Sequence, residues 1–131
     1  MFGERDSQGV AIETTARNRR RHQKGDTQIE KSDREKLFTI FDARTLANSI
    51  GNKSASAKDR WKVSNNAGDY LCNFIYWKVL AHQSGLPCVF VHVPALAAAK
   101  SEVETAHIAR QATLLINEMV KQLRKFRKSQ N

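Results

Sequence analysis

The sequence predicts an α/β layered domain, in which helices pack against a sheet. Three segments rich in apolar residues carry this prediction because they alternate as helix, strand and helix: residues 70–82, 88–93 and 101–125. The chain of 131 residues has the length of one domain with a core of its own. Its composition, with 40% hydrophobic and 27% charged residues, is typical of a globular protein rather than a disordered one.

Residues 70–82 (YLCNFIYWKVLAH) predict a buried helix. Lys78 is the only formally charged residue in this segment, so we expect neighbouring elements to cover most of the helix circumference. Residues 64–69 (SNNAGD) precede it and contain small and helix-capping residue types, which favour a tight turn into the helix. Gly85 and Pro87 follow the segment and predict the end of the helix.

The other two apolar segments complete the predicted layers. Residues 88–93 (CVFVHV) form a β-branched, apolar run between two prolines, which is typical of an interior strand. In residues 101–125 apolar side chains recur every three or four positions, and this spacing predicts a long amphipathic helix. Upstream, residues 37–41 are interpreted as a strand or as the first turn of a helix that continues through residues 42–50.

The chain is strongly basic, with 22 Lys and Arg against 13 Asp and Glu, a net charge of +9. The basic run of residues 17–24 is read most simply as a solvated loop or helix face. A basic nucleic-acid-binding module, built on this run and on residues 121–128, is an alternative function. Phe126 is the only aromatic residue in the two runs, so base stacking has little support and we disfavour nucleic acid as a partner.

Several classes of protein are excluded by the cysteine content and by the apolar segments. The two cysteines, Cys72 and Cys88, do not suit a disulfide framework, and no metal-binding spacing occurs, so we expect neither metal nor cofactor. Residues 79–99 carry no formal charge, but histidines, a glycine and prolines interrupt them, so no membrane contact is expected. Residues 1–9 lack the apolar core of a signal peptide, and the expected location is the cytoplasm.

Cys72 is the first candidate for chemistry. If the helix begins near residue 68 or 69, this cysteine lies in or beside its first turn, where the helix dipole favours an anion. Such a position lowers the pKa of a thiol and makes the thiolate available as a nucleophile. The alternative is a small buried cysteine that only packs.

His92 and Glu13 are candidates for a base and its partner. His92 lies near the end of the predicted strand, and strand carboxyl ends and helix N-termini open onto the same crevice in an α/β sheet. An imidazole beside Cys72 could accept the thiol proton and later protonate a leaving amine. Glu13, which follows the apolar residues 10–12, could orient that imidazole. The alternatives are a structural histidine and a surface glutamate.

Three short motifs occur in the same order as in a known enzyme family. Residues 67–73 (AGDYLCN) match a motif AG-x-Y-x-CN, and residues 92–94 (HVP) match a second motif. Residues 13–18 (ETTARN) match a third, E-x-x-A-x-N. Together they resemble the active-site region of the pyroglutamyl peptidase I family, also called pyrrolidone carboxyl peptidases. The resemblance implies a twisted mixed sheet flanked by helices, of the phosphorylase/hydrolase-like kind.

The resemblance also implies an activity. Members of that family are cysteine exopeptidases that remove an N-terminal pyroglutamyl residue from a peptide through a thioester and without a metal. Carried over to the matching positions, Cys72 would be the nucleophile, His92 the base and Glu13 the residue that holds the imidazole. The implied partners are N-terminally pyroglutamylated peptides, and assembly into a homo-oligomer is left open.

The chain departs from the family pattern after Glu13. The family has a segment there that contributes an arginine near the substrate carbonyl. Arg21 is the corresponding candidate in this chain, and Asp26 could replace the aspartate that follows the arginine. Backbone N–H groups at the start of the Cys72 helix are an equally good proposal for stabilising the oxyanion.

The second departure is at the N-terminus. Met1 corresponds to a point well inside the usual family sequence, and the aromatic segment that clasps the pyrrolidone ring has no counterpart here. Residues 1–131 are therefore expected to form one partial, N-terminally truncated domain of this family. A truncated or degenerate homologue without activity is the alternative function.

Overall fold

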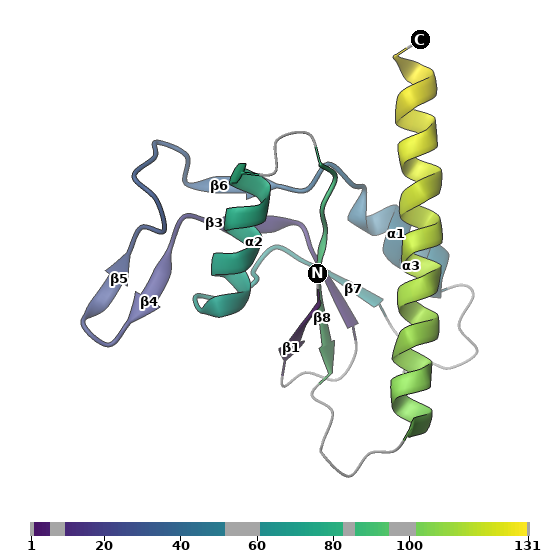
Figure 1. Cartoon of the computed structure of the whole chain (residues 1–131), viewed down its shortest axis with the longest axis horizontal. Coiled ribbons are helices and arrows are strands. Elements are labelled where there is room, and N and C mark those ends of the chain that lie inside the picture. The colour runs from purple at the N-terminus through teal and green to yellow at the C-terminus, as the bar shows by residue number, and fades with distance from the viewer. Residues whose placement is uncertain (1, 6–9, 52–60, 83–85, 95–101, 131) are drawn as a thin grey trace.

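The computed structural model describes residues 2–5, 10–51, 61–82, 86–94 and 102–130. A four-stranded mixed sheet lies at the centre with helices on both of its faces (Figure 1), which confirms the predicted α/β class. In order across the sheet the strands are β1 (Phe2–Arg5), β8 (Phe90–Pro94), β2 (Val10–Glu13) and β7 (Trp61–Ser64).

Strand β8 is an interior strand, as its valine-rich sequence predicts. It pairs in parallel with β1 and antiparallel with β2, and β2 pairs in parallel with β7. The strand begins at Phe90, two residues later than the apolar run itself. Because side chains alternate between the two faces of a strand, successive residues of β8 pack against two different layers of the molecule.

One face of the sheet packs against α1 (Ala43–Gly51) and α3 (Glu102–Ser129). Asp42 caps α1, since its carboxylate accepts hydrogen bonds from the backbone N–H (3.0 Å) and the hydroxyl (2.7 Å) of Thr45. The buried core of this face has eleven members: Val10, Ile12, Phe41, Ala43, Leu46, Ala47, Ile50, Trp61, Val89, Val91 and Leu115.

The other face of the sheet packs against α2 (Leu71–His82), where Tyr76, Trp77 and Phe90 are buried together. Most of the circumference of α2 is buried or half-buried, as predicted, but one stripe is not: Leu71 is 63% exposed and Ile75 is 37% exposed. Among the described residues, the sheet and the β3–β6 ladder lie on one side of α2, and its outer side faces solvent.

The basic run of residues 17–24 corrects the expectation of a solvated loop or helix face. It lies in a strand ladder, β3 (Thr15–Arg17) with β6 (Lys36–Phe38), and in a hairpin, β4 (Arg20–His22) with β5 (Gly25–Thr27). Gly25 has φ 115°, a conformation that glycine adopts without steric cost at a tight turn. The hairpin itself is exposed, as a run of charges requires.

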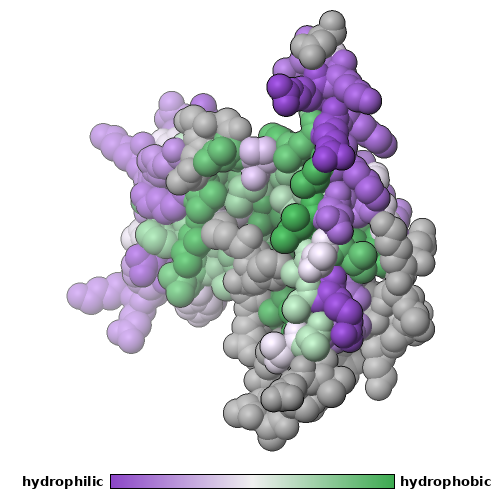
Figure 2. All heavy atoms as spheres, turned by 45° about the vertical axis from the view of Figure 1, so that its right-hand side comes forward, coloured by the Kyte–Doolittle hydropathy of each residue, from purple (hydrophilic) through white to green (hydrophobic). Residues whose placement is uncertain are grey.

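The C-terminal amphipathic helix is confirmed and extends as far as Ser129. Its last turns run past the rest of the molecule (Figure 1), and Figure 2 shows hydrophilic residues gathered there and apolar surface nearer the middle of the molecule. No helix in the described part of the chain is both long enough and apolar enough to cross a membrane.

Candidate active site

Glu13 and His92 meet in the interior of the molecule, on the α2 face of the sheet. In the β2–β8 pairing Glu13 lies opposite Phe90 and His92 lies opposite Ala11, so the two ionisable side chains are diagonal neighbours on one face. The His92 Nδ1 to Glu13 Oε1 distance is 2.8 Å, and their side chains are 5% and 0% exposed. When Nδ1–H donates to the carboxylate, Nε2 is the ring nitrogen that can accept a proton.

Aromatic side chains surround this pair. The ring of Phe90 lies 5.1 Å from that of His92 and 5.5 Å from that of Tyr76, measured between centroids. The Tyr76 hydroxyl donates a 2.9 Å hydrogen bond to the backbone carbonyl of Glu13. Burial raises the pKa of Tyr76 well above its ordinary value, so this hydroxyl keeps its proton and remains a donor.

Cys72 is the second residue of α2 and lies in its first turn, which begins with the hydrogen bond from Phe74 N–H to the carbonyl of Tyr70 (3.0 Å). Its side chain is half-buried and packs against the α2 face of the core, the same face that holds Glu13 and His92. Neither Cys72 nor Cys88 is in a disulfide bond. A thiol at a helix N-terminus has a physical reason to ionise.

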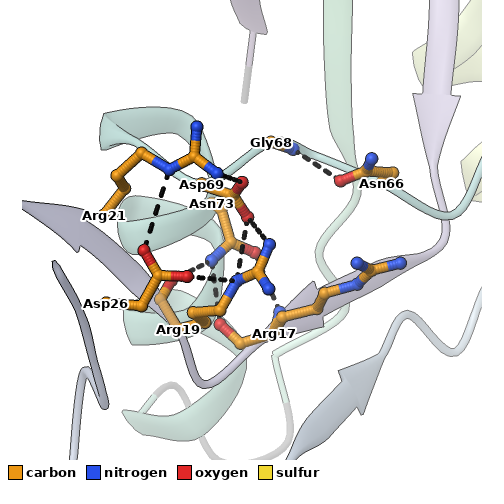
Figure 3. A network of polar contacts seen from close by, with 8 residues as sticks. All are labelled: Arg17, Arg19, Arg21, Asp26, Asn66, Gly68, Asp69 and Asn73. Carbon is orange, nitrogen blue, oxygen red and sulfur yellow. Dashed lines mark hydrogen bonds and ion pairs between the residues drawn. The ribbon is translucent and has the colours of Figure 1, made fainter.

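The turn into α2 follows the sequence prediction. Gly68 has φ 87°, and its backbone N–H donates to the side-chain oxygen of Asn66 (3.1 Å; Figure 3). Small and capping residues therefore close this turn, as residues 64–69 predicted. The turn sets where the first helical N–H groups point, which matters for any anion that approaches Cys72.

Arg21 and Asp26 lie together at the N-terminal end of α2, beside Asp69 (Figure 3). Arg21 Nε is 3.7 Å from Asp26 Oδ1, and Arg21 Nη2 is 3.6 Å from Asp69 Oδ2. The backbone N–H of Arg21 also donates to the carbonyl of Asp69 (2.8 Å). A hydrogen bond that Arg21 donates to the Tyr70 side-chain oxygen, together with the neighbouring carboxylates, raises the pKa of Arg21, so its guanidinium is a permanent cation beside the start of the helix.

Two polar residues near this cluster were given no role of their own by the sequence analysis, although Asn73 closes the AG-x-Y-x-CN motif. Arg19 lies 2.5 Å from Asp69 and 3.6 Å from Asp26, so it shares both carboxylates with Arg21. Asn73, which follows Cys72, is fully buried and hydrogen-bonds to the backbone of residues 17 and 19 (Figure 3). A buried asparagine in a helix of apolar residues is a signal that could have indicated its role.

The part of the chain that the structure describes contains no cluster of three or more His, Cys, Asp or Glu side chains that could hold a metal ion. What the described residues do present is a buried imidazole–carboxylate pair, with a cysteine at a helix N-terminus on the same face of the sheet. These are the components of nucleophilic chemistry by a thiol.

Taken together, the sheet, the two helix layers and these side chains define an α/β fold of the hydrolase-like kind. Solved structures with this fold are pyrrolidone carboxyl peptidases, so the family resemblance of the three motifs is confirmed at the level of the fold. No family model matches the sequence, and no curated protein matches it.

Three of these structures come from different organisms. The enzyme of the thermophilic keratin-degrading bacterium Fervidobacterium islandicum AW-1 is similar with a TM-score of 0.74 and 20% identity, over 92% of this chain and 67% of that one. The Thermococcus litoralis enzyme is similar with a TM-score of 0.77 and 19% identity, over 95% of this chain and 66% of that one. The Pyrococcus furiosus enzyme is similar with a TM-score of 0.71 and 16% identity, over 93% of this chain and 68% of that one. The chain thus spans about two thirds of the length of these proteins.

Proposed function

We propose that this chain is a cysteine peptidase that removes an N-terminal pyroglutamyl residue from peptides. Cys72 is the nucleophile, His92 the general base and acid, and Glu13 the carboxylate that orients the imidazole. The observation that carries the proposal is the buried 2.8 Å hydrogen bond between His92 and Glu13, on the face of the sheet against which the Cys72 helix packs. The likeness in fold to pyrrolidone carboxyl peptidases supports the choice of substrate.

The position of Cys72 on α2 supports its role as the third member of the proposed catalytic triad, with His92 and Glu13. Residues four apart on a helix lie on the same side of it, so the side chains of Cys72 and Tyr76 share one side of α2. The Tyr76 side chain reaches both Glu13 and Phe90, the neighbour of His92. Cys72 lies one helical turn before Tyr76 on this side, and it packs against the same cluster of buried side chains.

The chemistry follows from these roles. His92 Nε2 accepts the thiol proton, and the thiolate attacks the carbonyl carbon that joins the pyroglutamyl residue to the peptide. The tetrahedral intermediate collapses, the C–N bond breaks, and the imidazolium gives its proton to the leaving amine. A water molecule, deprotonated by His92, then hydrolyses the thioester and regenerates the thiol. Glu13 stabilises the imidazolium in both halves of the reaction.

The developing oxyanion needs a donor beside Cys72. Backbone N–H groups of the first turn of α2 are one source, and they cost no reorganisation because the helix fixes them. Arg21 is the other, with Asp26 in a supporting position. In the structure, however, Asp26 and Asp69 already share its guanidinium. We therefore favour the backbone groups for the oxyanion and assign Arg21 and Asp26 to the wall of the substrate site.

Release of a fluorophore from a pyroglutamyl amide tests the proposal. We expect the wild-type chain to release it and the Cys72→Ser variant to be slower by about three orders of magnitude or more, since the nucleophile is lost. Cys88→Ser is the matched control and should keep the activity. Equal rates for wild type and Cys72→Ser would remove the enzymatic proposal. Absence of turnover in a folded chain whose Cys72 still reacts with thiol reagents would favour the inactive homologue.

The proposed chemistry also fits a reducing location. A thiol nucleophile has to remain reduced between turnovers, and the cytoplasm keeps cysteines in that state. The cytoplasmic location therefore belongs to the same proposal. Its test is the fraction of Cys72 that is alkylated in intact cells before lysis, which should approach completeness.

A further inference from the structure

We propose that Asn73 and Tyr76 are positioning residues that together fix the Cys72 thiol relative to the Glu13–His92 pair. The inference rests on the proposed function, because it assigns a role in the same site. Both residues lie on α2, one directly after Cys72 and one a helical turn further on. Both reach the chain segment that begins with Glu13, so they connect the element that carries the thiol to the strand that carries the carboxylate.

Asn73 holds the first turn of α2. Its side-chain oxygen accepts a 2.8 Å hydrogen bond from the backbone N–H of Arg17, and its amide nitrogen donates to the carbonyls of Arg17 and Arg19, each at 2.8 Å. Figure 3 shows the side chain inserted between α2 and this stretch of backbone. Because Asn73 is fully buried, water cannot replace these bonds when the side chain is removed.

Tyr76 holds the second turn of α2. Its hydroxyl donates to the backbone carbonyl of Glu13 at 2.9 Å, and its ring packs on Phe90, the aromatic neighbour of His92. The side chain is fully buried. One residue therefore contacts both β2 and β8, the two strands that carry the carboxylate and the imidazole.

These contacts matter because the first turns of α2 are held on one side. Its outer side chains at the first turns, such as Leu71 and Ile75, are exposed, and the contacts on that side from Glu30 to Lys78 and His82 lie at the other end of the helix. Apolar packing alone resists sliding of a helix weakly, because dispersion contacts are not directional. Directional hydrogen bonds from Asn73 and Tyr76 to fixed backbone groups define where the first turn sits, and with it the sulfur of Cys72.

The pH dependence of Cys72 alkylation reports this position without requiring turnover. A thiolate held near an imidazolium and a helix N-terminus ionises below the ordinary thiol pKa of about 8.5. Iodoacetamide reacts with the thiolate, so the rate against pH gives the midpoint of ionisation. Mass spectrometry of the digested protein separates the Cys72 and Cys88 peptides. Cys88 serves as an internal reference, since burial raises its pKa.

Tyr76→Phe removes the hydroxyl and keeps the ring. We expect the Cys72 midpoint to rise by about 0.5 to 1 pH unit, so the alkylation rate at pH 6.5 falls about threefold to tenfold. Asn73→Ala should act in the same direction and more strongly. The matched control is Ile50→Val, a modest core change in α1 on the opposite face of the sheet, which should leave the Cys72 midpoint in place.

The outcomes separate this inference from the proposed function. A wild-type Cys72 with an ordinary midpoint would overturn both. A lowered wild-type midpoint that stays unchanged in Tyr76→Phe would overturn the role of Tyr76 alone, and the same holds for Asn73 in a folded Asn73→Ala. A shift of equal size in Ile50→Val would also overturn the inference, because general loosening would then explain it. If Asn73→Ala does not fold, Tyr76→Phe decides.

Discussion

Glu13 and His92 are ionisable side chains removed from water, and each is tolerable because the other is present. A carboxylate buried without a partner costs several kcal/mol, and a hydrogen-bonded cation or N–H donor offsets much of that cost. The pair occupies positions where the strand pattern would otherwise place apolar side chains. Two polar residues at such positions need a reason other than stability, and a reacting site supplies one.

Removal of one member of this pair should be more harmful than removal of both. We expect His92→Ala to lower the free energy of unfolding by about 3–5 kcal/mol, because the Glu13 carboxylate stays buried without its donor. The double variant Glu13→Gln/His92→Ala should be less destabilised than His92→Ala alone. Urea unfolding followed by circular dichroism measures both. If the losses of unfolding free energy caused by Glu13→Gln and by His92→Ala simply add in the double variant, the coupling between Glu13 and His92 is contradicted.

At the scale of elements, α2 is attached at its C-terminal end as well as at its first turns. The carboxylate of Glu30 contacts Lys78 Nζ at 2.5 Å and also His82 Nε2. These contacts join the loop that precedes β6 to the end of α2. Hydrogen bonds from Lys78 and His82 lower the pKa of Glu30 to about 2. The Glu30 carboxylate therefore keeps its negative charge over most of the acid range, and it holds the loop to the end of the helix.

This attachment gives an expected acid dependence. Because the pKa of Glu30 is lower in the folded chain than in the unfolded one, its contribution to stability is complete above about pH 5 and is lost as the pH falls through about 2. The Tm difference between wild type and Glu30→Gln should thus be constant from pH 6 to 5 and shrink toward pH 2. Glu35→Gln, an exposed change in the same loop, is the control. A difference that is independent of pH would contradict the role of Glu30.

The elements that sequence patterns predict are those with apolar periodicity. The helix of residues 70–82, the strand around residues 90–93 and the C-terminal helix were predicted because each buries a regular set of side chains. Strands β4 and β5 carry exposed side chains throughout, and backbone pairing and a glycine turn hold them. No local pattern marks such strands, and the basic run that contains β4 was interpreted as a solvated loop or helix face.

In the candidate site, too, local sequence patterns predict individual residues but not the long-range contacts between them. Cys72, His92 and Glu13 were predicted from their places at element ends and from the three motifs, and the contact between Glu13 and His92 spans 79 positions. The side-chain hydrogen bonds of Asn73 and Tyr76 join residues more than 50 positions apart. Such contacts depend on how the layers assemble, which the sequence of α2 does not encode locally.

For the whole molecule, the net charge of +9 overstates how much cationic surface is available. Within the basic run, Arg19 and Arg21 share the carboxylates of Asp26 and Asp69. On α3, Lys121 Nζ lies 2.8 Å from a carboxylate oxygen of Glu118. Pairing of this kind leaves fewer cations to neutralise phosphates, which is the main source of affinity for nucleic acid.

We therefore expect only weak binding to duplex DNA. Fluorescence anisotropy with a labelled duplex should give a Kd no tighter than about 10⁻⁴–10⁻⁶ M at physiological salt, the usual range for non-specific contacts. The affinity should fall steeply between about 50 and 200 mM salt as counterions compete. Tight binding that persists at the higher salt concentration would instead favour the nucleic-acid-binding alternative.

Strand β8 and the residue before it contact both layers of the protein with alternate side chains: Val89, just before the strand, and Val91 face α1 and α3, and Phe90 and His92 face α2. Inserting or deleting a single amino acid just before Val91 would move each following side chain of the strand to the opposite face of the sheet. The imidazole would then enter the apolar core beneath α1 and α3, and a valine would face the Glu13 carboxylate. Evolution can thus lengthen the loops on either side of β8 with little penalty, whereas this short stretch tolerates replacement of its residues but no change in their number.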